Sequence, residues 1–215
     1  MKKPRVLMAD DHSLILAGLR KLVDGECEVV GTVEDGRALV EAAKKLRPDL
    51  ILLDISMPLL NGLEAARQLR TLVPDSKLIF LTMHTSPTYA TEAFQAGACG
   101  YLLKRSAASE LSLAIKSVLQ GQHYLTPSLT KDVLESVLKP SSGERGKAAS
   151  TALTSRQREV LQLVAEGRGT KEIATILNVS VKTVEFHKFR IMQQLDIHTT
   201  ADLTKYAITH GITGL

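Results

Sequence analysis

The sequence contains no tryptophan, and aromatic residues make up only 4% of its 215 residues. Because pockets for small organic signal molecules are usually rich in aromatic side chains, this composition argues against a binding site of that kind. No apolar run approaches the roughly 20 residues that a helix needs to cross a bilayer, so we expect no membrane contact. The two cysteines, Cys27 and Cys99, lack the spacing of metal ligands and indicate reduced core thiols in a cytoplasmic protein.

The charge is modestly positive and unevenly distributed. The formal net charge is +4, and residues 153–215 carry eight Lys and Arg against six Asp and Glu. This excess permits nucleic-acid binding by the last third of the chain without arguing strongly for it. At 215 residues, 44% of them hydrophobic, the chain has material for one or two domains with proper cores.

The first 125 residues alternate between short apolar runs and amphipathic segments. The apolar runs predict strands at residues 6–9, 28–33, 50–53, 77–82 and 100–104. The amphipathic segments predict helices at residues 13–24, 36–47, 63–72, 87–96 and 107–119. Five such units with short connections predict a flavodoxin-like, doubly wound α/β domain with a five-stranded parallel sheet. In the first helix we expect Leu14, Ala17 and Leu22 to face the core.

Asp54 directly follows four large aliphatic residues, 50–53, which is the pattern of a strand buried on both faces. An unpaired buried charge costs several kcal/mol, so this carboxylate is not an ordinary core residue. Ligand-binding groups of open α/β sheets gather at the carboxyl ends of strands, which favours a site residue. Taken alone, Asp54 is explained about equally well as a cap for the turn at residues 56–58.

The ends of three other strands decide between these explanations. Asp10 and Asp11 follow the first strand, and Thr82 and Lys104 end the fourth and fifth. Three carboxylates in one crevice repel each other unless a cation joins them, and Mg²⁺ prefers such oxygen ligands. A lysine can bind one phosphoryl oxygen and a threonine hydroxyl can donate to another. A carboxylate here, such as Asp54, can act as the nucleophile that forms an aspartyl phosphate.

Residues 4–120 resemble the receiver domain of bacterial response regulators. The resemblance rests on Asp10-Asp11, Asp54, Met57-Pro58, Asn61-Gly62, Leu81-Thr82 and residues 100–104. It implies that Asp54 accepts a phosphoryl group from a sensor histidine kinase, assisted by Thr82 and Lys104. It also implies a switch pair, Thr82 and Tyr101. The implied Mg²⁺ ligands are Asp10, Asp11, Asp54 and the main-chain carbonyl of Ser56.

Two positions depart from known patterns. Many receivers have a proline after the lysine, often with a cis peptide, whereas Arg105 stands here and leaves the geometry of this bond open. An aspartate-nucleophile phosphatase of the haloacid dehalogenase type would have a second aspartate two residues after the nucleophile, where Ser56 stands. We therefore expect a regulator and not an enzyme.

Residues 126–152 are predicted to join two domains, a receiver at residues 1–125 and a third region at residues 153–215. Pro127 and the apolar spacing that follows it predict a short amphipathic helix. This helix would either pack on the receiver or mediate contacts. Residues 139–147 have no apolar anchor and are typical of a tether.

Four helices are predicted in the last third, at residues 155–167, 171–177, 181–195 and 201–210. The second and third, joined by a tight turn at residues 178–180, have the layout of a helix-turn-helix. At about 100° per residue, Phe186 and Phe189 lie roughly 200° and 140° from the apolar stripe of the third helix. The stripe comprises Val184, Ile191 and Leu195, and the outer face also holds Lys182, Arg190 and Gln193. Both phenylalanines therefore point outward, towards DNA or another protein surface.

Residues 153–161, 171–174 and 181–184, together with His187, resemble the LuxR-type helix-turn-helix. Combined with a receiver, this resemblance implies a response regulator of the NarL/FixJ class, a phosphorylation-activated transcription regulator. It implies binding to double-stranded promoter DNA, a homodimer when phosphorylated, and RNA polymerase as a candidate partner; activation and repression both stay open. The implied DNA-binding residues are Lys171, Ser180, Lys182, Thr183, Glu185, Phe186, Phe189 and Arg190, of which Glu185, Phe186 and Phe189 occupy base-reading positions.

Overall fold

A computed structural model describes residues 2–138 and 153–214. The chain folds into two compact units. No helix among the described residues combines the length and the apolar content needed to cross a membrane.

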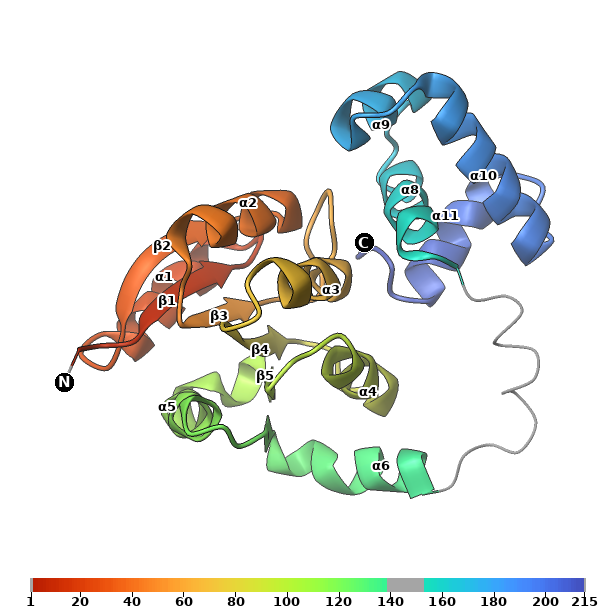
Figure 1. Cartoon of the computed structure of the whole chain (residues 1–215). Helices are drawn as coiled ribbons and strands as arrows, with labels where there is room; N and C mark the ends of the chain where they lie inside the picture. Colours follow the sequence, from red (N-terminus) through yellow and green to blue (C-terminus); the bar gives the residue numbers. More distant parts are fainter. Residues whose placement is uncertain (1, 139–152, 215) are drawn as a thin grey trace. The chain divides into compact units, whose positions relative to one another are not determined.

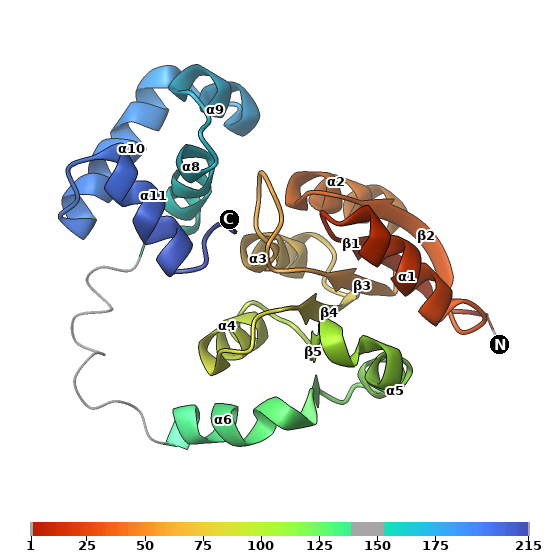
Figure 2. The same cartoon turned by 180° about the vertical axis from the view of Figure 1, so that it is seen from behind.

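A parallel sheet with the strand order β2-β1-β3-β4-β5-β6 forms the centre of the first unit (Figure 1). The strands are β1 (Arg5–Ala9), β2 (Glu28–Val33), β3 (Leu50–Leu53), β4 (Lys77–Thr82), β5 (Gly100–Leu103) and β6 (Tyr124–Leu125). The helices are α1 (Ser13–Val23), α2 (Gly36–Leu46), α3 (Gly62–Leu72), α4 (Pro87–Gln95), the 3₁₀ turn η1 (Lys104–Ser106), α5 (Ala107–Leu119) and α6 (Pro127–Leu138). Helices α1 and α5 lie together on one face, and α2, α3 and α4 follow one another on the other (Figure 2).

The predicted doubly wound fold is confirmed, with one strand more than expected. All four residues of β3 are buried, as a strand covered on both faces requires. The additional strand, β6, pairs in parallel with Gly100 and Tyr101 of β5. It is two residues long, which is too short for an alternation of apolar and polar residues to predict it.

The predicted core face of the first helix is wrong. Leu14 is 83% exposed, Ala17 is exposed and Leu22 is 42% exposed. The buried residues are Leu16, Leu19 and Val23, which belong to the same core cluster as residues of α5. Because α1 has apolar residues around most of its circumference, two stripes with helical spacing compete, and only packing against α5 selects one of them.

The segment after β5 also differs from the prediction. Strand β5 ends at Leu103, one residue earlier than predicted, and Lys104 is the first residue of η1. All peptide bonds of the described residues are trans, including that between Lys104 and Arg105, which answers the question left open by the missing proline.

Helix α6 belongs to the first unit, which therefore extends past the predicted boundary at residue 125. The helix contacts α4, and its Leu129 is buried. Buried Thr126 joins it to the sheet: its main-chain N–H donates to the carbonyl of Tyr101, and its hydroxyl accepts from the N–H of Leu103 at 3.2 Å. The same hydroxyl donates to Glu110 of α5 at 3.0 Å. The predicted tether at residues 139–147 lies outside the described residues.

The second unit consists of the helices α8 (Ser155–Ala165), α9 (Thr170–Leu177), α10 (Val181–Leu195) and α11 (Thr200–Thr209). Thr154 and Gln157 form a capping box at the start of α8. The hydroxyl of Ser180 accepts a hydrogen bond from the N–H of Thr183 at 3.1 Å and caps α10. Helices α9 and α10 are joined through Asn178, in the left-handed conformation with φ 51°, so the predicted helix-turn-helix is present.

Candidate functional site

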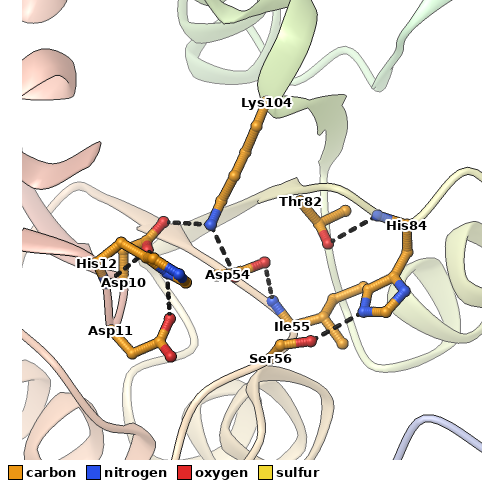
Figure 3. A network of polar contacts seen from close by, with 9 residues as sticks. All are labelled: Asp10, Asp11, His12, Asp54, Ile55, Ser56, Thr82, His84 and Lys104. Atoms are coloured by element: carbon orange, nitrogen blue, oxygen red, sulfur yellow. Dashed lines mark hydrogen bonds and ion pairs between the residues drawn. The ribbon is translucent and has the colours of Figure 1, made fainter. Parts of the chain in front are cut away.

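The carboxylates of Asp10 and Asp54 share the ammonium group of Lys104 (Figure 3). The Lys104 Nζ lies 2.7 Å from Asp10 Oδ2 and 2.8 Å from Asp54 Oδ2. Strands β1 and β3 are neighbours in register, with Ala9 opposite Leu53, so the two aspartates that follow them leave the sheet side by side. Lys104 follows β5 at the same edge. The sheet topology thus brings together three of the predicted site residues.

Each carboxylate is also fixed by the main chain. Asp54 Oδ1 accepts a hydrogen bond from the N–H of Ile55 at 2.7 Å, and Asp10 Oδ1 accepts one from the N–H of His12 at 3.0 Å. Both aspartates are almost fully buried. Burial alone disfavours the charged form of Lys104, but the hydrogen bonds and charges of the two aspartates outweigh it and raise the pKa of Lys104 above its ordinary value.

Asp11 and His12 complete the polar cluster beside Asp10. His12 Nδ1 lies 2.8 Å from Asp11 Oδ1 and 3.3 Å from Asp10 Oδ1. Across residues 2–138 and 153–214, Asp10, Asp11 and His12 make up the close cluster of side chains that could ligate a metal ion. Sequence reasoning missed His12, although it directly follows the two aspartates. The Asp54 carboxylate is paired with Lys104 and does not belong to this cluster.

The charges of the site fit a divalent cation. Asp10, Asp11 and Asp54 bring three negative charges and Lys104 one positive charge, so two negative charges remain uncompensated among these four side chains. Oxygen-rich ligands with excess negative charge are the donors that Mg²⁺ prefers.

The two predicted switch residues both hydrogen-bond to the main chain of His84. Thr82 is fully buried, and its Oγ1 accepts from the N–H of His84 at 3.3 Å. Tyr101 is equally buried and donates its hydroxyl to the carbonyl of His84 at 2.9 Å. Burial raises the pKa of the Tyr101 phenol far above its ordinary value. His84 therefore links two residues that belong to different strands.

The ring of His84 extends this link towards the site. Its Nε2 lies 2.9 Å from Ser56 Oγ, and the ring stacks on Tyr89 with centroids 4.2 Å apart. Burial lowers the pKa of His84, with the charge of Asp54 opposing this effect. Sequence reasoning missed His84; its place two residues after Thr82 was the available signal, but its partner Ser56 is 28 residues away in sequence.

The Asn61-Gly62 pair shapes the loop after Asp54. The Asn61 side chain accepts from the N–H of Glu64 at 2.9 Å and caps α3. Gly62 donates its N–H to the carbonyl of Ile55 at 2.8 Å. A Cβ atom at position 62 would overlap the carbonyl oxygen of Asp54, so only glycine permits this approach.

Helix α10 of the second unit carries the predicted DNA-binding residues. Val184 and Ile191 are buried, whereas Phe186 is 58% exposed and Phe189 is 63% exposed, which confirms the predicted outer face. The Arg190 guanidinium lies 5.9 Å from the centre of the Phe186 ring. Seven of the eight predicted residues belong to this helix or cap it and are exposed or partly exposed, namely Ser180, Lys182, Thr183, Glu185, Phe186, Phe189 and Arg190. The eighth, Lys171, is exposed in the first turn of α9.

Comparisons with known proteins agree with this arrangement. The family model described as "Response regulator receiver domain" matches residues 6–116, and the one described as "Bacterial regulatory proteins, luxR family" matches residues 151–207. The chain is 35% identical over 209 residues to the response regulator UvrY of Escherichia coli K12, covering 96% of this chain and 94% of the relative. It is 35% identical over 210 residues to the oxygen regulatory protein NreC of Staphylococcus epidermidis, covering 95% and 96%.

Solved structures are similar over the whole chain. The response regulator RcsB of Salmonella typhimurium superposes with a TM-score of 0.66 at 28% identity and covers all of both chains. A structure of an RcsB–DNA complex superposes with a TM-score of 0.58 at 28% identity, covering 95% of this chain and 98% of the other.

Proposed function

Because the chain belongs to the bacterial response regulators that join a receiver domain to a luxR-family DNA-binding domain, we propose that Asp54 is its phosphoacceptor and that phosphorylation controls binding to promoter DNA. The protein is a DNA-binding transcription regulator and not an enzyme. The observation that supports Asp54 is its buried carboxylate at the end of β3, paired with Lys104 at 2.8 Å. The equally buried Asp10 also contacts Lys104, but it belongs to the cluster with Asp11 and His12 that could ligate a metal ion.

The proposed donor is a phosphohistidine of a sensor histidine kinase. A carboxylate oxygen of Asp54 attacks the phosphorus, the phosphorus–nitrogen bond breaks, and a phosphorus–oxygen bond to Asp54 forms. The ammonium of Lys104 lies where it can bind an oxygen of the transferred group. Asp10, Asp11, Asp54 and the main-chain carbonyl of Ser56 would hold Mg²⁺, which supplies the further positive charge that a phosphoryl group requires.

The proposed switch runs from Thr82 to Tyr101. A phosphoryl group adds about −1.5 to −2 charges at pH 7, and the Thr82 hydroxyl is the neighbouring donor on β4. When this hydroxyl turns towards the phosphoryl group, it no longer accepts from the N–H of His84. Because the carbonyl of His84 holds the hydroxyl of Tyr101, a shift of His84 would also release Tyr101. We propose that this change favours a homodimer or frees the DNA-binding unit.

DNA binding is assigned to the helix-turn-helix, with α10 in the major groove. Lys171, Lys182 and Arg190 would contact phosphates, which hold the helix in register without reading sequence. Ser180 and Thr183 at the start of α10 would donate to the same backbone, and Glu185, Phe186 and Phe189 would face base edges. A phosphorylated dimer would bind two half-sites, with RNA polymerase as a candidate partner, in the cytoplasm.

Intact-mass spectrometry tests the phosphoacceptor. The full chain incubated with Mg²⁺ and a small phosphodonor should gain one phosphoryl group, and Asp54→Asn should gain none. Asp75→Asn, an exposed aspartate in a loop, is the matched control and should be phosphorylated like the parent. Asp10→Asn should slow the reaction by weakening Mg²⁺ binding, and higher Mg²⁺ should restore part of the rate. Undiminished phosphorylation of Asp54→Asn would disprove the assignment.

A further inference from the structure

Two phenylalanines of α10 form an exposed apolar surface. Phe186 and Phe189 are 58% and 63% exposed, although the core stripe of the same helix is buried. Neighbouring aromatic rings left in water on one helix face indicate a surface that a partner covers. Because the rings carry no hydrogen-bonding group, the partner must offer an apolar group in the same place.

The surroundings of these rings indicate a partner with a negatively charged frame. Exposed Lys182 and Arg190 lie on the same side of the helix. The Arg190 guanidinium lies 5.9 Å from the centre of the Phe186 ring, a contact that orients both groups. Glu185 also lies beside the rings, but its carboxylate would be repelled by backbone phosphates. The part of the helix that carries Glu185 and the two rings should therefore face base edges, while Lys182 and Arg190 contact the phosphates.

We propose that Phe186 and Phe189 select DNA half-sites by contact with the 5-methyl groups of thymine. This inference rests on the proposed DNA-binding role of α10 and specifies what the helix recognises. The thymine methyl is the one apolar group that the four bases present in the major groove. A ring placed against any other base edge would leave that edge's donors or acceptors unpaired, which is unfavourable.

The spacing of the two rings limits the half-site. Residues three apart on a helix are separated by about 4.5 Å along its axis, at 1.5 Å per residue. Successive base pairs are about 3.4 Å apart. Two rings at this separation fit methyl groups on neighbouring base pairs, on either strand. We therefore expect half-sites with consecutive A·T pairs under α10 and no requirement for guanine at these positions.

Replacing thymine by uracil tests the inference directly, because it removes the methyl group and leaves all hydrogen-bonding groups of the base in place. Half-sites are first selected from random DNA with the full chain, treated with Mg²⁺ and a phosphodonor. Each thymine of the selected site is then replaced in turn by uracil. Affinity should fall about fourfold at each methyl that a ring contacts, the effect of about one buried methylene, and should be unchanged elsewhere.

Variants connect these methyl groups to the two rings. Phe186→Ala and Phe189→Ala should each bind the thymine and uracil versions of their own base pair equally. Phe186→Leu, which keeps an apolar side chain, should retain part of the preference. Val181→Ala is the matched control, since Val181 is exposed on the same helix but about 110° away from the middle of the ring-bearing side at 100° per residue. It should retain the full preference.

The outcomes separate this inference from DNA binding itself. Loss of binding to both selected and scrambled DNA in Lys182→Ala, with a smaller salt dependence, would support DNA binding without bearing on the methyl groups. If the parent binds thymine and uracil sites equally, or if the alanine variants retain the thymine preference, the inference is overturned. An alanine variant that retains this preference but self-associates less would assign the rings to a second copy of the chain. If the parent binds no DNA in either state, the proposed function fails first.

Discussion

Replacing Lys104 by methionine should destabilise the receiver unit, and divalent cations should reverse part of the loss. The Lys104 side chain is 8% exposed and lies between two carboxylates that are 2% and 5% exposed, at 2.7 and 2.8 Å. Methionine retains most of the aliphatic stem and removes the charge. Asp10 and Asp54 are then left as like charges in a buried site.

The size of the effect follows from this geometry. Removing one partner from a buried ion pair costs about 3–5 kcal/mol. Each carboxylate here retains a hydrogen bond from the main chain, Asp54 from Ile55 and Asp10 from His12, which favours the lower end of this range. At 1.4 kcal/mol per factor of ten, about 3 kcal/mol corresponds to roughly 100-fold faster exchange of amides that open with the whole unit.

Hydrogen exchange of the full chain, followed by mass spectrometry on peptides that cover β1 and β3, isolates the receiver unit. In EDTA, Lys104→Met should exchange roughly 100-fold faster than the parent. Mg²⁺ should protect the variant more than the parent, because the loss of the ammonium leaves three uncompensated charges in place of two. Lys116→Met, which removes an exposed pair with Glu26 at 3.4 Å, should leave these peptides unchanged. Parent-like exchange of Lys104→Met in EDTA would refute the reasoning, as would a difference that Mg²⁺ leaves untouched.

Four further predictions follow from single contacts. Gly62→Ala should abolish phosphorylation in the mass assay and lower the melting temperature, because the new Cβ displaces the Asp54 carbonyl; retention of both would contradict the close approach. Tyr101→Phe should cost about 1 kcal/mol in urea unfolding through the lost bond to the His84 carbonyl; an equally stable variant would show that this bond contributes nothing. Thr154→Ala should cost about 1 kcal/mol by removing the capping box of α8, measured in the same way, and Ser155→Ala serves as its control. Burial, and then the charge of Arg156, lower the pKa of His187, so its NMR titration midpoint should lie below about 6.5. The stability that the neutral ring contributes is fully present above about pH 6.5 and is lost as the pH falls through the midpoint. His187→Gln should lose less stability over the same pH range.

Much of the fold and of the site could be predicted from the sequence because each depends on strong local patterns. The run of four large aliphatic residues at Leu50–Leu53 predicts a central parallel strand without any knowledge of its neighbours in space. Parallel strands end at one edge, so Asp10, Asp54 and Lys104 had to converge once the strands were recognised. The outer face of α10 was predictable for the same kind of reason, because the aliphatic stripe that contains Val184 and Ile191 determines the phase of the helix and hence where Phe186 and Phe189 point.

Tertiary structure decided whatever the local pattern left degenerate. Helix α1 has two apolar stripes, and contact with α5 buries Leu16 and Leu19 and exposes Leu14. Strand β6 has no periodicity of its own and exists because β5 offers it an edge. His84 joins Ser56, Thr82 and Tyr101 through contacts that span up to 28 residues of sequence. The sequence alone determined which residues end the strands, since strand formation depends on neighbours along the chain. Which partners those residues meet was decided by packing, because that depends on neighbours in space.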